Sequence, residues 1–279
     1  IQTSNSPNVP FGENNITAKY NRGKSQWGVN YNLVYNQFKK RRTNKSETYN
    51  LGDKIIHREQ VGINDRRSYS VQDIDLSYNL SEPGKYVFNA IFRNNINNTP
   101  HQDDSNKLFD ASNADQYTLS KVRANSDSYT PALDLYFQRI LPKEQTLTLN
   151  LTGTLIRTNA ERQYREQTAG NTTLANFETN IEGHKRSIIG EGIYDKRFKK
   201  VMLTAGMRHY QMYAENKYTG SEPVTSEMDQ MRSSAFLELQ GNIKKVSYGV
   251  SAGLTRSYFS ESGMEHSYYQ FTPTVRFGF

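Results

Sequence analysis

An all-β fold, an antiparallel up-and-down transmembrane β-barrel of about twelve strands, is predicted by three features of this sequence. Apolar and polar residues alternate with period two in about a dozen runs, as in strands whose successive side chains face opposite ways. Hydrophobic residues make up 35% of the 279 residues, which is less than a core of two packed layers usually contains. Tight polar turns alternate with longer polar segments, an asymmetry that transmembrane barrels show.

The clearest alternation lies in residues 147–158, which read LTLNLTGTLIRT. Four leucines share one side of this predicted strand, and threonine and asparagine occupy the other side. Further runs of the same kind begin at Trp27, Tyr86, Leu133 and Val246, and a last one ends at Phe279. A sheet with one apolar and one polar face that recurs so often must either pack against a second sheet or close around a wet interior.

Five short polar turns punctuate the chain at intervals of roughly 45–60 residues, a spacing that indicates repeated hairpins. They are predicted at 22–25, 81–85, 141–145, 195–200 and 242–245. Looser polar segments, expected to be the long loops of the opposite end, lie at 98–126, 167–176 and 219–229. We expect one outer-membrane β-barrel domain over residues 1–279, with an irregular entry segment at 1–12.

The composition excludes several classes of function and of binding site. The chain contains no cysteine, so disulfides and thiolate metal sites are excluded. The net charge of +7 comes from basic residues that are dispersed along the sequence, which argues against a nucleic-acid partner. No apolar run approaches the ~18–20 residues of a membrane helix, whereas barrel strands are shorter and alternate.

No catalytic, cofactor or metal motif stands out, and the sequence therefore predicts that the protein is not an enzyme and binds no cofactor. His101 with Asp103 and Asp104 offers too few ligands for a calcium site. His209 lies on an alternating strand with many serines and threonines within reach, so a chance pairing with a hydroxyl is expected there. The sequence therefore identifies no active site.

The phase of the alternating runs predicts which polar side chains face a barrel lumen. We expect the residues that bind or pass a solute to come from this set: Asn30, Asn32, Asp134, Gln138, Asn150, Arg208, Arg232, Glu238 and Arg276.

Several segments resemble the outer-membrane β-barrel family of TonB-dependent receptor-like proteins from Bacteroidetes. They are residues 13–38, 131–158, 186–198, 206–220 and 268–279, and the resemblance spans nearly the whole chain. It implies a nutrient receptor of the bacterial outer membrane, whose barrels typically have about 22 strands. Twelve strands would form only part of such a barrel. We therefore expect the chain to be incomplete at both ends and to lack the plug domain.

The resemblance also implies partners: outer-membrane lipid, a surface lipoprotein, and the TonB system through a plug domain outside this chain. Two alternatives stay open. One is a self-contained small barrel acting as a passive channel or an outer-membrane enzyme, in which the strands near Ile16 and Phe277 would pair. The other is a soluble β-sandwich adhesin or carbohydrate-binding protein, in which Leu147, Leu149 and Leu151 would face a second sheet.

Overall fold

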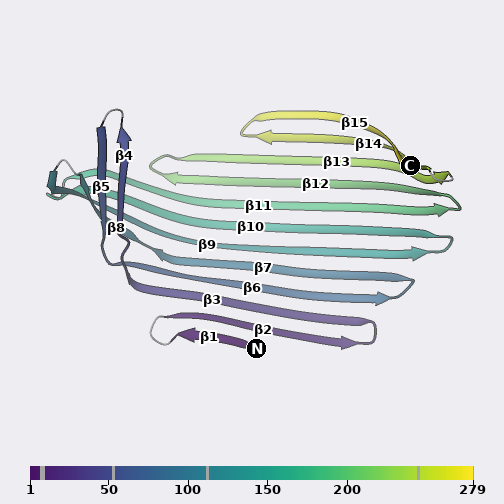
Figure 1. Ribbon diagram of the computed structural model, residues 1–279, viewed down its shortest axis with the longest axis horizontal. Coiled ribbons are helices and arrows are strands. Elements are labelled where there is room, and N and C mark those ends of the chain that lie inside the picture. Colours follow the sequence, from purple (N-terminus) through teal and green to yellow (C-terminus); the bar gives the residue numbers. More distant parts are fainter. Residues whose placement is uncertain (7–9, 52–53, 111–112, 244–245, 279) are drawn as a thin grey trace.

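A single curved antiparallel sheet contains nearly every residue that the computed structural model describes, namely 1–6, 10–51, 54–110, 113–243 and 246–278 (Figure 1). Within this part of the chain the sheet has 15 strands. All pairs are antiparallel, and most join strands that are consecutive in sequence. The predicted all-β, up-and-down antiparallel fold class is therefore confirmed.

Twelve strands form the main path of the sheet, in agreement with the expected number. In spatial order they are β1 (Gln2–Ser6), β2 (Phe11–Arg22), β3 (Ser25–Arg41), β6 (Asp65–Glu82), β7 (Tyr86–Gln102), β9 (Asn113–Leu141), β10 (Gln145–Thr168), β11 (Thr173–Phe198), β12 (Val201–Gly220), β13 (Val224–Ile243), β14 (Val246–Glu261) and β15 (Met264–Gly278).

Three shorter strands branch from the main path at the end away from the tight turns. They are β4 (Lys45–Leu51), β5 (Lys54–Gly62) and β8 (Asp104–Asp110). β4 pairs with β5, β5 pairs with β8, and β8 pairs with the first half of β9. In Figure 1 this branch runs crosswise to the long strands.

The polar segments expected to be long loops are mostly strand, which corrects the sequence analysis. Residues 98–126 contain the end of β7, all of β8 and the first half of β9. At 167–176 and 219–229, turns of a few residues interrupt hairpins that otherwise continue. Residues 1–12, expected to be irregular, contain β1 and the start of β2. Polar residues at both faces hid these strands, because alternation is visible in a sequence only when one face is apolar.

The tight turns lie together at the other end of the strands, on the right in Figure 1. Gly23 and Gly84 have positive φ angles of 58° and 77°, and Lys143 and Glu144 have φ angles of 62° and 56°. Positive φ angles are common in such short hairpin loops. The turn within 195–200 is shown by the pairing of Phe198 with Val201. Four of the five predicted turns are thus confirmed; residues 244–245 of the fifth lie outside the described part.

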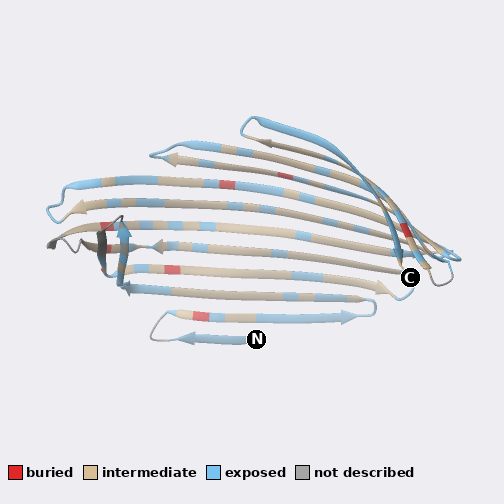
Figure 2. Ribbon diagram, turned by 45° about the horizontal axis from the view of Figure 1, so that its top comes forward, coloured by how far each residue is buried: buried red, intermediate tan, exposed pale blue. Residues whose placement is uncertain are grey.

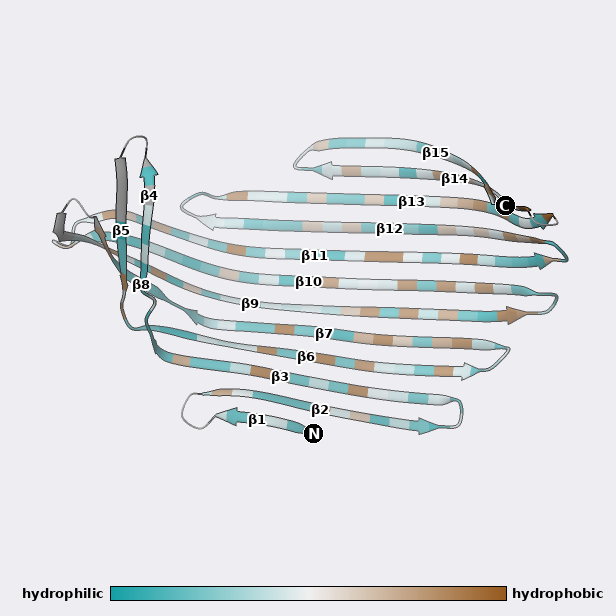
Figure 3. Cartoon of the chain, viewed as in Figure 1, coloured by the Kyte–Doolittle hydropathy of each residue, from teal (hydrophilic) through white to brown (hydrophobic). Residues whose placement is uncertain are grey.

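Register and alternation divide the sheet into an apolar face, which carries Leu149 and Leu151, and a polar face, which carries Asn150. Directly paired residues point to the same side of a sheet. The residues paired in succession outward from Leu149 therefore all belong to the apolar face. On one side they are Phe137, Phe88 and Leu80. On the other side they are Gly192, Met207, Ala235, Leu254 and Phe271. Figure 3 shows the resulting alternation of hydrophobic (brown) and hydrophilic (teal) residues along the strands.

No second layer covers the apolar face. Leu149 is 43% and Leu151 42% exposed, and Val29, Leu76, Leu133, Leu237 and Val275 on the same face are also exposed. Of the described residues, Met212 is the one large hydrophobic side chain that is buried, and Figure 2 shows how scattered the buried positions are. A sandwich would have covered these residues with another sheet, so that alternative is wrong for the described chain.

The apolar stripe crosses the sheet obliquely. Ala18, in the middle of the stripe in β2, is in register with Gly153 of β10 through the intervening partners. Val275, in the middle of the stripe in β15, is in register with Gln145. The stripe therefore shifts by eight residues over the ten strand spacings from β2 to β15. At ~3.4 Å per residue and ~4.8 Å per strand, a level apolar band requires strands tilted by about 30°.

The two edges of the sheet are not paired with each other. Among the described residues β1 pairs only with β2, and β15 pairs only with β14. The pairing between the regions of Ile16 and Phe277 that a self-contained barrel requires is therefore not present. Nor does the described part of the chain include a helix long and apolar enough to cross a membrane.

An ion-pair cluster joins two neighbouring turns outside the apolar stripe. The Glu82 carboxylate lies 2.6 Å from Lys24 Nζ and 2.7 Å from Lys85 Nζ. The hydrogen bonds from Lys24 and then from Lys85 lower the pKa of Glu82 below its ordinary value of 4.5. A carboxylate whose pKa is lower in the folded protein stabilises it above the unfolded pKa and loses this effect as the pH falls through the folded pKa.

We therefore expect the difference in melting temperature between the wild type and Glu82→Gln to be present at pH 7 and to shrink below about pH 4.5. Thermal unfolding of both proteins between pH 7 and pH 3 measures this difference. A constant difference over the whole range would contradict an ionic role for Glu82.

Candidate functional site

The polar face is connected from strand to strand by side-chain hydrogen bonds. At one end Asn15 Nδ2 and Thr17 Oγ1 each donate to Asn30 Oδ1 at 3.0 Å, and Asn30 Nδ2 donates to Asp75 at 3.4 Å. In the middle Asn95 Nδ2 donates to Asp73 at 2.6 Å. These polar groups thus find partners on the neighbouring strands, which stabilises a surface that has no packed layer above it.

Asp134, another of the predicted residues, accepts hydrogen bonds from both neighbouring strands. Arg93 Nη1 donates to its Oδ2 at 2.6 Å, and Thr152 Oγ1 donates to its Oδ1 at 2.9 Å. One carboxylate on β9 therefore joins β7 to β10. Both partners of the ion pair are partly exposed, so its contribution to stability belongs to the weak surface class.

Register places all nine sequence-predicted residues on the polar face. Asn150 donates to Glu191 at 3.0 Å, Gln138 donates to Thr148 at 3.4 Å, and Glu238 accepts from Gln240 at 2.7 Å. The structure does not gather the nine at one point, because they come from β3, β9, β10, β12, β13 and β15. Asp134 and Gln138 are diagonal neighbours of Asn150 across β9 and β10, and Arg208 and Arg232 are diagonal neighbours across β12 and β13.

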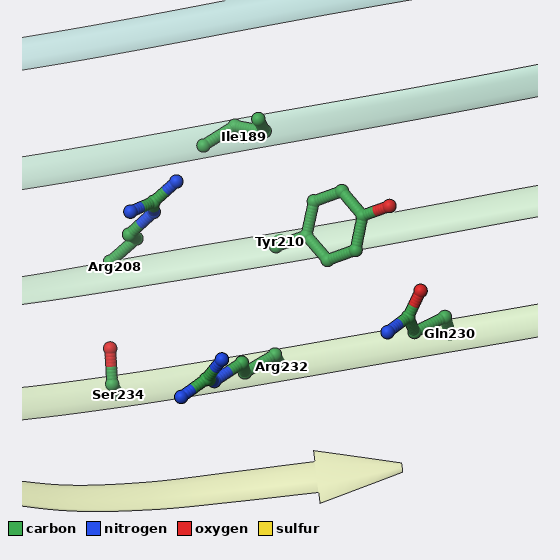
Figure 4. Close-up of a pocket in the computed structure, with 6 residues that line it drawn as sticks. All are labelled: Ile189, Arg208, Tyr210, Gln230, Arg232 and Ser234. Carbon is green, nitrogen blue, oxygen red and sulfur yellow. The ribbon is translucent and has the colours of Figure 1, made fainter. Parts of the chain in front are cut away.

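Those two arginines line a hollow of about 400 Å³ on β11, β12 and β13 (Figure 4). The hollow is lined by Ile189, Arg208, Tyr210, Gln230, Arg232 and Ser234. Arg208 lies opposite Ser234, and Tyr210 lies opposite Arg232, so the arginines are diagonal neighbours across one strand pair. Sequence reasoning missed Tyr210, Gln230 and Ser234, although they share the phase of the two arginines on the same strands.

The arginines of the hollow have no acidic partner. Neither forms an ion pair with any residue that the structure describes. The nearest carboxylate by register is Glu191, opposite Arg208, and its Oε2 accepts from Asn150. Two neighbouring guanidinium groups without an acidic partner form a surface suited to anions.

On the apolar face, His209 Nδ1 and Ser233 Oγ are 2.8 Å apart. This is the contact between a hydroxyl and a base that nucleophilic catalysis requires. Arg256 lies opposite Ser233, and its guanidinium lies 5.9 Å from the ring centre of Tyr269. No third group that would orient the imidazole is bonded to it among the described residues, so the pair does not form a triad.

The other histidine considered from the sequence does not form a metal site. Asp103 contacts Arg66 at 3.4 Å, and Asp104 accepts from Asn106 at 2.8 Å. Within the described ranges no three His, Asp or Glu side chains come close enough to hold a metal ion.

Fold and faces together define a class of protein: an antiparallel β-sheet wall with one uncovered apolar face and one hydrogen-bonded polar face. No protein-family model and no curated protein matches the sequence, so the receptor family named from the sequence is not confirmed. A solved structure similar to the chain is the outer membrane protease OmpT from Escherichia coli, at 11% identity and a TM-score of 0.29. The match covers 88% of this chain and 95% of that chain.

The expectation that the protein is not an enzyme is contradicted by this match, because the matched structure is that of an outer membrane protease. At this degree of similarity no residue of the protease is equated with a residue of this chain, and no catalytic role is transferred.

Removing Asp134 tests the polar-face network. We expect Asp134→Ala to destabilise the sheet by about 1 kcal/mol, since Arg93 and Thr152 both lose an acceptor. Urea unfolding of Asp134→Ala, Arg93→Ala and the double variant measures the coupling, and Arg276→Ala serves as a control on the same face. Strictly additive effects of Asp134→Ala and Arg93→Ala would show that the two side chains do not interact.

Proposed function

We propose that this chain is the wall of an outer-membrane β-barrel whose polar face lines a water-filled path for a solute. The observation that carries the proposal is the oblique stripe of uncovered apolar side chains. Water would oppose the exposure of such a surface, whereas the hydrocarbon of a bilayer would accept it. The polar face needs no apolar partner if it borders water in a lumen.

The tilt of the stripe supports a membrane rather than another protein as the apolar medium. Strands of transmembrane barrels are tilted by ~35–45°, and the drift of the stripe gives about 30° from the spacings of a sheet. The extent also fits: in β10 the stripe runs from Leu147 to Leu155, and a tilted membrane strand needs ~9–11 residues.

The open edges support the further proposal that additional strands complete the wall. Unpaired backbone groups are not tolerated at an edge exposed to lipid, and both β1 and β15 have one free side in the described chain. In this proposal the completed barrel is receptor-like and takes up a nutrient. The resemblance of segments such as 13–38 and 131–158 to TonB-dependent receptor-like proteins supports that finer part.

A charge placed on either face of the same strand tests the proposal. Leu151→Arg would put a cation at the middle of the stripe, where transmembrane barrels lose about 2–4 kcal/mol. Thr154→Arg, on the polar face of β10, is the matched control. We expect the wild type and Thr154→Arg to float with phosphatidylcholine vesicles in a density gradient, and Leu151→Arg to float much less.

Two results would overturn the proposal. One is equal flotation of the two arginine variants, which would mean that Leu151 does not face lipid. The other is a wild-type protein that stays monodisperse at high concentration without detergent, because an uncovered apolar face of this size would then be stable in water.

A further inference from the structure

We infer that the hollow between β11, β12 and β13 is a binding site for an oxyanion, the carboxylate or phosphate group of a solute. The inference deepens the proposed function, since it takes the polar face to border the path of that solute. It assigns a ligand class to Arg208 and Arg232.

Hydrogen-bond donors exceed acceptors in the hollow. Each guanidinium carries five N–H donors, and the Gln230 amide, the Tyr210 hydroxyl and the Ser234 hydroxyl can add more. Carboxylates are absent from the described lining. None of these five polar side chains has a hydrogen bond to another described residue. A bound oxyanion would supply the acceptors that the protein itself does not provide.

Charged groups at several other places on the polar face have partners within the sheet. Arg93 pairs with Asp134 at 2.6 Å, and Asp195 accepts from Thr204 at 2.6 Å. Glu191, which could have neutralised Arg208, is bonded to Asn150. Two positive charges without a carboxylate partner therefore lie on adjacent strands in this hollow.

The placement of the two arginines suits one shared anion. They lie on adjacent strands as diagonal neighbours, a separation of ~7–8 Å between backbones that long side chains can bridge. A guanidinium presents a planar fork that matches the two oxygens of a carboxylate or phosphate. Both arginines are exposed, so a solute in the proposed lumen can reach them without a change in the fold.

An apolar wall adds to the strength of the site. Ile189 lies opposite Tyr210, and Met212, which is only 6% exposed, lies opposite Gln230 on the same face. Apolar groups beside the guanidinium groups reduce the local dielectric constant, and attraction between an anion and the arginines increases as that constant falls.

Titration of the full-length chain in detergent micelles with inorganic phosphate, and separately with acetate, tests the inference. Both experiments are run at constant ionic strength set with chloride, and binding is followed by calorimetry. Saturable binding of either probe supports an oxyanion site. Tighter binding of phosphate indicates a phosphorylated solute, and tighter binding of acetate indicates an organic acid.

Variants locate the binding. We expect Arg208→Gln and Arg232→Gln each to weaken the bound probe by about 10- to 100-fold, the range for a lost charged hydrogen bond. Arg208→Lys keeps the charge without the fork and should give a smaller loss. Arg276→Gln removes a cation of the same face outside the hollow and should leave the affinity unchanged.

The outcomes separate this inference from the proposed function. Failure of the wild type to bind either probe, or equal weakening by Arg276→Gln, would overturn the oxyanion site even if the protein still floats with vesicles. Saturable binding by a protein that does not float would support the site and count against the membrane wall.

Discussion

The structure depends on one constraint: an antiparallel sheet with no second layer must find its apolar medium outside the chain. Leu149 and Leu151 are about four-tenths exposed, and Met207 and Phe271, which share their face in register, are about two-thirds exposed. In water such a face is unfavourable in proportion to its area. Backbone hydrogen bonds between strands hold the sheet together, while the medium against the apolar face determines where it can exist.

The same constraint explains the polar face. Side chains there cannot gain stability from a core, so they gain it from one another across the strands. Asn30, Asp73 and Asp134 each accept hydrogen bonds from an adjacent strand. Each bond contributes little in a solvated setting, but the series connects polar groups from β2 to β12. Where the series ends, at Arg208 and Arg232, the surface has donors to offer to another molecule.

Strand tilt connects the two faces. An apolar band that stays level in a bilayer must move along the sequence from each strand to the next when the strands are inclined. The shift from Ala18 in β2 to Val275 in β15 corresponds to strands inclined by about 30°. The polar face follows the same inclination, so residues at equal depth on neighbouring strands are not those paired in register. The crosswise branch of β4, β5 and β8 lies beyond the band, at the end opposite the tight turns.

The sequence by itself determined the period-two alternation, and with it the fold class and the face on which each of the nine predicted residues lies. Asn30 and Arg276 are 246 positions apart and still share a face, because alternation is a local property of an extended backbone. Turns such as 81–85 were also recognisable, since their residues favour positive φ.

Only the tertiary structure determined which side chains of different strands lie beside one another. Asp134 meets Arg93 across β7 and β9, which are not consecutive in sequence, and Arg208 lies diagonal to Arg232 across one hairpin. Both placements depend on strand register, and a shift of a single residue would exchange the faces. The strands within 98–126 were not recognised from the sequence either, because their few apolar residues, among them Leu108, Phe109 and Leu119, do not alternate regularly with polar ones. Register and strand order are set by many cross-strand contacts together, so they cannot be predicted from any short segment of the sequence.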